Sequence, residues 1–112
     1  MSGDLDDVLR AIAEPRRRAI LRLVATEELP AGRIAEHFDV TRSAVSQHLQ
    51  VLKDAGLIIE RRDGTRRIYR ASEEALSELR NVVESLWQQS LMKARDTAEG
   101  VEGRAHDESA VG

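Results

Sequence analysis

The feature that most constrains the fold is a change of hydrophobic period at Gly56. Before it, apolar side chains recur at helical spacing from Val45 to Leu52. After it, residues 57–62 and 66–70 are rich in β-forming side chains and are joined by an Asp-Gly-Thr turn. Because Asp-Gly between two such runs is typical of a tight turn, the sequence predicts an amphipathic helix followed directly by a β-hairpin.

Four further helices are predicted by apolar periodicity together with start and stop signals. Asp4 can cap the first helix, and Pro15 suits the first position of the second, which ends near Ala25. Pro30 can open a short third helix, and Ser72 can cap a long last one. The predicted fold is therefore mainly α with a small β-hairpin: four helices, two strands and a final helix, the order of a winged helix-turn-helix.

The charge of the chain is distributed unevenly. The whole sequence has 17 Lys and Arg against 20 Asp and Glu, a net charge of -3. Residues 41–70, however, hold seven Lys or Arg against three acids, whereas residues 71–112 hold four against nine. Since charges beyond a Debye length of about 8 to 10 Å are largely screened, the basic middle segment can still meet a phosphate backbone.

The fourth predicted helix has an unusual polar face. With its apolar stripe turned inward, geometry places outward side chains that can donate hydrogen bonds, where a merely solvated helix more often carries Glu and Lys pairs. Such side chains suit base edges and phosphates in a DNA groove. We therefore predict a base-reading helix that uses Thr41, Arg42, Ser43, Ser46, Gln47 and Gln50.

The predicted hairpin is strongly basic at its turn. Four arginines accompany a single acid in the seven residues RRDGTRR, at the cost of mutual repulsion. Arginine groups of this kind can bind phosphates or enter a narrow minor groove, although any exposed hairpin can also carry arginines for solubility. The wing contacts that we predict are Arg61, Arg62, Arg66 and Arg67.

Three stretches together resemble the ArsR/SmtB family of bacterial winged-helix transcription regulators, over about residues 8–70. They are LRAIAEPRRRAIL, ELPAGRIAEHFDVTRSAVSQHLQVLKDAGLI and ERRDGTRRIYR. The resemblance implies a homodimeric repressor of a palindromic operator, in which the first and last helices pair the two chains. The apolar residues of the last helix form a line that is too long for a small core to cover. This line also indicates a partner chain. The implied dimer interface is Leu5, Val8, Leu9, Leu79, Val83, Leu86 and Trp87.

The chain departs from the metal-sensing members of that family. Where those members commonly carry a cysteine pair, this sequence has Pro30 and Gly32, and it contains no cysteine at all. Residues 72–95 hold no histidine, and His37 and His106 are too scattered for a metal-ligand spacing. We predict no cofactor and no metal site, and hence a regulator that does not sense metals.

The predicted function is a sequence-specific transcriptional regulator, most simply a repressor that binds double-stranded DNA as a homodimer. Two alternatives remain open: a winged-helix module that binds proteins rather than DNA, and a metal-responsive repressor with an unrecognised intersubunit site. No catalytic triad, phosphate loop or carboxylate dyad suggests an enzyme. The operator, the inducing signal and the choice between activation and repression are not specified.

The domain organisation follows from length and composition. A chain of 112 residues with 41% hydrophobic content suits one domain. We predict that residues 1–95 form a DNA-binding and dimerisation domain and that residues 96–112, rich in Gly, Ala and acids, form a disordered acidic tail. Neither a membrane span nor a signal peptide is apparent, so we expect a cytoplasmic protein.

Overall fold

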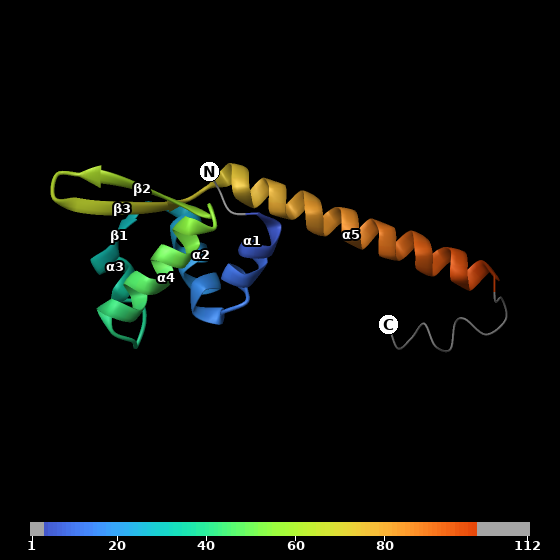
Figure 1. The fold of residues 1–112 in the computed structure, drawn as a ribbon, viewed down its shortest axis with the longest axis horizontal. Coiled ribbons are helices and arrows are strands. Elements are labelled where there is room, and N and C mark those ends of the chain that lie inside the picture. The colour runs from blue at the N-terminus through green and yellow to red at the C-terminus, as the bar shows by residue number, and fades with distance from the viewer. Residues whose placement is uncertain (1–3, 101–112) are drawn as a thin grey trace. The chain divides into compact units, whose positions relative to one another are not determined.

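The computed structural model describes the backbone of residues 4–100 and the side chains of residues 4–95. The chain divides into two compact units, and the boundary follows Glu78 within the last helix. The elements are α1 (Leu5–Ile12), α2 (Pro15–Thr26), β1 (Leu29–Pro30), α3 (Ala31–Ala35), α4 (Arg42–Asp54), β2 (Ile58–Asp63), β3 (Arg66–Ala71) and α5 (Glu73–Gly100). The winged helix-turn-helix predicted from the sequence is confirmed (Figure 1).

Capping hydrogen bonds confirm the predicted helix starts at Asp4 and Ser72, and Thr41 caps α4 in the same way. The Asp4 carboxylate accepts a hydrogen bond from the Asp7 backbone N–H at 2.9 Å, and the Thr41 hydroxyl accepts one from Ala44 at 3.0 Å. Ser72 caps α5 in the same way. These side chains satisfy backbone donors that have no partner inside a helix. At the other end of α4, Gly56 has a φ of 81°, the left-handed conformation that closes a helix.

The sheet has one more strand than the sequence predicted. Its order is β1-β3-β2, and all pairs are antiparallel. Pro30, which was expected to open the third helix, is the N-cap of α3 and at the same time pairs with Ile68 as the end of β1. A strand of two residues has no period to detect, and proline is tolerated at a strand end because it needs no N–H partner there.

The hairpin turn has the predicted chemistry. Asp63 and Arg66 are paired across the strands, which leaves a loop of two residues, Gly64 and Thr65. Gly64 has a φ of 69°, which fits the first central position of a hairpin turn, where only glycine adopts positive φ without strain.

The core lies between the sheet and helices α2, α3 and α4, which Figure 1 shows on one side of the strands. It consists mainly of aliphatic side chains together with Tyr69, and no buried polar side chain occurs in the described part of the chain. Helix α4 contributes its predicted stripe, with Val45, Leu49 and Leu52 each no more than 2% exposed. The buried stripe fixes which face of α4 is left for solvent.

The last helix extends further than expected. Helix α5 runs to Gly100, five residues into the tail predicted to start at residue 96, and the disorder of that tail stays a prediction. The remainder of the predicted tail, residues 101–112, lies outside the described residues. None of the helices in the described chain combines the length and the apolar character that crossing a membrane requires.

Candidate nucleic-acid interface

Helix α4 and its N-cap residue carry the six residues predicted to read bases, and all six are exposed. Two are engaged within the helix: the Thr41 hydroxyl caps it, and Gln50 Nε2 donates to Asp54 Oδ1 at 2.8 Å. Ser43, Ser46 and Gln47 make no side-chain hydrogen bond to other described residues. These three side chains are therefore available to an external partner.

Arg42 lies at the first turn of α4 and reaches back toward α3. Its guanidinium lies beside Gly32, where an added Cβ would be 3.8 Å from the Arg42 Nη1 atom. At that distance an added Cβ would make ordinary van der Waals contact, so Arg42 lies against α3 without requiring a glycine there. Arg42 is exposed, as are the other polar residues predicted on this face of α4.

Helix α4 is held from behind by a contact that sequence reasoning missed. Arg17 on α2 donates to two carbonyls at the end of α1, to Ala11 at 2.6 Å and to Arg10 at 3.1 Å. Its Nη1 atom also lies 3.4 Å from His48 Nδ1 on α4. Since a guanidinium can only donate, His48 Nδ1 accepts, which assigns the ring proton to Nε2. His48 is thus a half-buried histidine with a hydrogen bond to α2.

The arginines at the start of α2 are compensated mainly by backbone carbonyls. One carboxylate also takes part: Glu14 Oε2 lies 4.0 Å from Arg16 Nη1, while Glu14 Oε1 accepts hydrogen bonds from the backbone N–H groups of Arg16 and Arg17. Partial desolvation raises the pKa of Glu14, but the hydrogen bonds from Arg17 and Arg16 lower it and prevail. Arg18 bonds the Ile12 carbonyl at 2.7 Å. Cationic donors at a helix C-terminus favour the dipole of α1.

The four arginines predicted for the wing fall into two pairs with different surroundings. Arg61 is bound by Glu28, with Arg61 Nε and Nη2 at 3.0 and 2.8 Å from its carboxylate oxygens, and Arg67 Nε lies 3.2 Å from Glu60 Oε2. Among the described residues, no carboxylate oxygen lies within 4.0 Å of the side-chain nitrogens of the other two arginines. Those two are Arg62 and Arg66, both exposed beside the turn.

The acids that bind the wing arginines are fully charged at neutral pH. The hydrogen bond from Arg61 lowers the pKa of Glu28, and the charge of Arg70 adds to the effect. The hydrogen bond from Lys53 lowers the pKa of Glu60, and Arg67 and Arg62 lower it further. Each acid therefore acts as a permanent counter-charge inside a basic surface.

The sequence matches known bacterial regulators over this same region. The profile of the arsR family of bacterial regulatory proteins matches residues 14–60. The chain is 41% identical over 86 residues to the HTH-type transcriptional regulator Rv2034 of Mycobacterium tuberculosis, covering 77% of this chain and 80% of the relative. The protein belongs to the ArsR family. It is 42% identical over 60 residues to the transcriptional repressor SdpR of Bacillus subtilis, covering 54% of this chain and 67% of that protein.

Solved structures agree with the fold. The homodimeric winged helix-turn-helix DNA-binding domain Mb0332 of Mycobacterium bovis is 36% identical, covers 78% of this chain and 83% of its own, and has a TM-score of 0.60. An ArsR-like regulator from Rhodococcus sp. RHA1 has a TM-score of 0.78 at 23% identity, covering 88% and 93% of the two chains. The protein is thus an ArsR-family transcriptional regulator with a winged-helix domain.

No metal-binding constellation is formed by the part of this ArsR-family chain that the structure describes. Within residues 4–95, no three His, Asp or Glu side chains converge as ligands would. His37 Nδ1 lies 2.9 Å from the Arg33 carbonyl on its own helical turn, while His106 lies outside the described residues. That the whole chain has no metal site stays a prediction.

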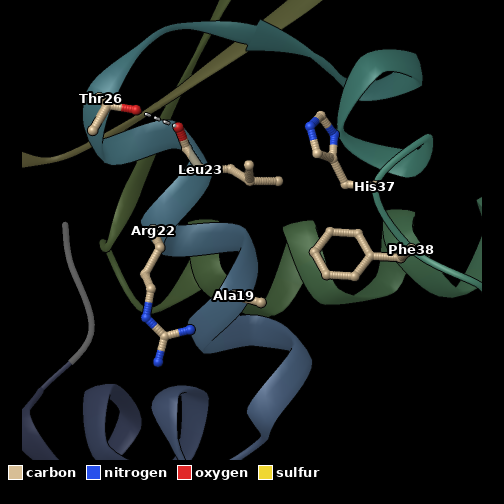
Figure 2. Close-up of a pocket in the computed structure, with 6 residues that line it drawn as sticks. All are labelled: Ala19, Arg22, Leu23, Thr26, His37 and Phe38. Atoms are coloured by element: carbon tan, nitrogen blue, oxygen red, sulfur yellow. Dashed lines mark hydrogen bonds between the residues drawn. The ribbon is translucent and has the colours of Figure 1, made fainter.

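A shallow pocket of about 340 Å³ lies between α2 and the segment that follows α3. Figure 2 shows His37 and Phe38 from that segment on one side, facing Leu23 and Ala19 of α2. Thr26 at the end of α2 donates to the Leu23 carbonyl at 3.3 Å, so its hydroxyl is already engaged. The pocket is widely open and separate from the exposed polar face of α4.

The residues predicted to pair two chains differ in exposure. On α1, Leu5 and Leu9 are exposed, whereas Val8 is half-buried and packs against the core of its own chain. On α5, Leu79 and Val82 are half-buried, while five apolar residues that follow leave about half or more of their surface exposed. These are Val83 at 52%, Leu86 at 59%, Trp87 at 65%, Leu91 at 51% and Met92 at 62%. The last two extend the predicted row.

Proposed function

We propose that this ArsR-family regulator is a homodimeric repressor that binds a palindromic operator and so excludes the transcription machinery from a promoter. The observation that carries the proposal is the polar face of α4, on which the side chains of Ser43, Ser46 and Gln47 are exposed and form no hydrogen bond to other described residues. Like other DNA-binding regulators, it would act in the cytoplasm and without catalysing a reaction. The name of the related repressor SdpR supports repression.

The proposed contacts of α4 follow from side-chain chemistry. Gln47 offers both a donor and an acceptor, which suits an adenine edge, and Arg42 suits a guanine edge or a phosphate. Ser43 and Ser46 can donate to bases or phosphates. Thr41 keeps a hydroxyl donor although its oxygen caps the helix, and Gln50 keeps its carbonyl oxygen although its amide bonds Asp54.

The proposed wing contacts are made by the tip of the hairpin. Arg62 and Arg66 are exposed and adjoin the turn, so they can meet phosphates or a narrow minor groove beside the groove that receives α4. Arg61 and Arg67 contribute to the same positive surface, but their side chains are already bound by acids.

The proposed dimer buries the apolar rows of α1 and α5 between two chains. A helix that exposes Val83, Leu86, Trp87, Leu91 and Met92 together has an apolar surface larger than isolated exposed residues explain. The homodimeric relative from Mycobacterium bovis supports this assembly. Two-fold symmetry then sets the recognition helices about 34 to 36 Å apart, one turn of DNA.

Binding to the DNA upstream of the protein's own gene tests the proposal. We expect a gel shift on that fragment, a footprint with two half-sites one helical turn apart, and retention on heparin. A protein that is a clean dimer but ignores both DNA and heparin would instead be a protein-interaction module. A footprint over a single half-site would contradict the dimeric mode of binding.

A further inference from the structure

The β2–β3 hairpin carries one bound acid on each of its two faces. Glu60 and Arg61 are neighbours on β2, so their side chains point to opposite faces of the strand. On one face, Glu60 accepts a hydrogen bond from Lys53 at 2.6 Å. On the other, Arg61 donates two hydrogen bonds to Glu28, which immediately precedes β1. Each acid thus connects the hairpin to a different part of the helix-turn-helix.

The hairpin needs such connections because its outer half has no third strand. β1 pairs with β3 only at Ile68 and Tyr69, whereas the pairing of β2 with β3 continues outward to Asp63 and Arg66. A two-stranded ribbon is marginally stable by itself. Moreover, Arg62 and Arg67 stand directly opposite each other, and like charges in that position repel.

Glu60 offsets this repulsion and ties the hairpin to α4. Its carboxylate lies diagonally across from Arg67, 3.2 Å from Nε, and only 14% of the Glu60 side chain is exposed, although the Arg67 side chain is 58% exposed. Lys53, which shares the carboxylate, belongs to the last turn of α4. The acid therefore fixes the base of the wing against the helix that carries the exposed polar face.

Glu28 makes the corresponding connection on the other face. It binds Arg61 on β2 through both carboxylate oxygens and lies 3.8 Å from Arg70 Nε on β3. A bidentate guanidinium–carboxylate pair fixes orientation as well as distance. Both strands of the hairpin are thus held to the segment that joins α2 to β1.

We propose that Glu28 and Glu60 are positioning residues for DNA binding, which hold the hairpin at a fixed angle to α4 so that Arg62 and Arg66 at its tip meet the duplex. The inference rests on the proposed function. The proposal predicts that removing either acid changes the affinity for DNA in the direction opposite to that expected from charge alone. Since DNA repels carboxylates, removal of an acid from a DNA-facing surface would ordinarily strengthen binding, whereas loss of a positioning acid weakens it.

The test replaces each acid by its uncharged isostere. We expect Glu60→Gln and Glu28→Gln each to weaken operator binding by about five- to tenfold, because the phosphate contacts that set register are misplaced. Binding to random DNA, which tolerates many geometries, should stay equal or become tighter. The matched control is Glu36→Gln, which removes the same charge from an exposed acid paired with Arg33 at 3.4 Å on α3. Operator binding that tightens in both test variants, as in the control, overturns the proposal.

A combined variant separates positioning from a general loss of stability. When Arg62 and Arg66 are both replaced by alanine, the hairpin tip has neither of the arginines that are proposed to contact DNA. Adding Glu60→Gln to this variant should therefore cost no further operator affinity. A further fivefold loss in that background contradicts positioning, because it shows that Glu60 acts elsewhere than through the tip.

Hydrogen exchange in the free protein tests, without DNA, whether the two acids hold the hairpin in place. The amides of the hairpin from residue 62 to residue 67 should exchange faster in Glu28→Gln and Glu60→Gln than in wild type or in Glu36→Gln. Exchange at the wild-type rate overturns the positioning role. If the wild-type protein shifts no DNA, the proposed function fails, while the exchange rates still decide whether the acids hold the hairpin.

Discussion

The division of the wing arginines into two pairs predicts different salt dependence for two matched double variants. One variant, Arg62→Ala/Arg66→Ala, removes the arginines without an acidic partner among the described residues. The other, Arg61→Ala/Arg67→Ala, removes the same number of charges, but from side chains bound by Glu28 and Glu60. Both pairs lie on the same hairpin, so each variant controls for the other.

The expected magnitude follows from counterion release. Each phosphate neutralised on duplex DNA contributes about 0.9 to the slope of log K against log salt. If both tip arginines touch phosphate in each half-site, their removal flattens the slope of a dimer by about 3.6. Between 50 and 200 mM salt this amounts to about two decades less loss of affinity. Arginines already neutralised by carboxylates release few counterions, so the second variant should change the slope by less than half as much.

Fluorescence anisotropy of labelled operator over that salt range measures both slopes, with circular dichroism as the check that both variants fold. Weaker binding at one salt concentration does not discriminate, because the second variant also disturbs the hairpin. Equal flattening in the two variants would refute the reasoning, since it would mean that DNA displaces the acids and uses all four arginines alike.

Four further outcomes are expected. Gln47→Ala should weaken operator binding by about 1 to 3 kcal/mol and random DNA hardly at all in competition titrations; equal losses would assign Gln47 to phosphate. Leu86→Glu should dissociate the dimer in sedimentation equilibrium, because it places a charge in the apolar row of α5, and a variant that stays dimeric would move the interface elsewhere. Zinc, cadmium and arsenite at micromolar concentrations should leave operator affinity unchanged, and a tenfold effect reversed by a chelator would establish a metal sensor. Because their native pKa values lie below the ordinary 4.5, Glu28 and Glu60 contribute stability that is present at higher pH and lost as pH falls below about 4.5; the melting temperature of Glu60→Gln should therefore fall less steeply than that of wild type in that range.

Much of the fold could be predicted because its signals are local. Capping by Asp4, Thr41 and Ser72 involves residues three positions apart, and the buried stripe of α4 repeats every helical turn. The exposed face of α4 followed from that stripe by geometry alone. By contrast, β1 is too short to show a period, and Pro30 fits both a helix start and a strand end.

The sequence analysis did not predict that Glu28 and Glu60 bind the wing arginines. One of these contacts joins residues that are far apart in the chain. Glu28 and Arg61 are 33 positions apart, and only the pairing of β1 with β3 brings them together. The contact between Glu60 and Arg67 could have been predicted from the sequence. Once the Asp-Gly turn fixes the hairpin register, Glu60 and Arg67 fall on the same face as diagonal neighbours, which is a signal that opposite charges can interact.

Under the proposed function, the pairing of cations with acids explains how a chain with a net charge of -3 would favour an operator over other DNA. Of the seven Lys and Arg in residues 41–70, four are bound by Glu28 or Glu60, which leaves Arg42, Arg62 and Arg66. Non-specific affinity grows with the number of cations free to neutralise phosphate, whereas base reading depends on where a few side chains lie. Fixing four cations in ion pairs therefore lowers the non-specific affinity without weakening base reading. The three that remain limit the contribution of this surface to the salt slope to about 2.7 per half-site, so a steeper contribution would require the acids to release their partners on DNA.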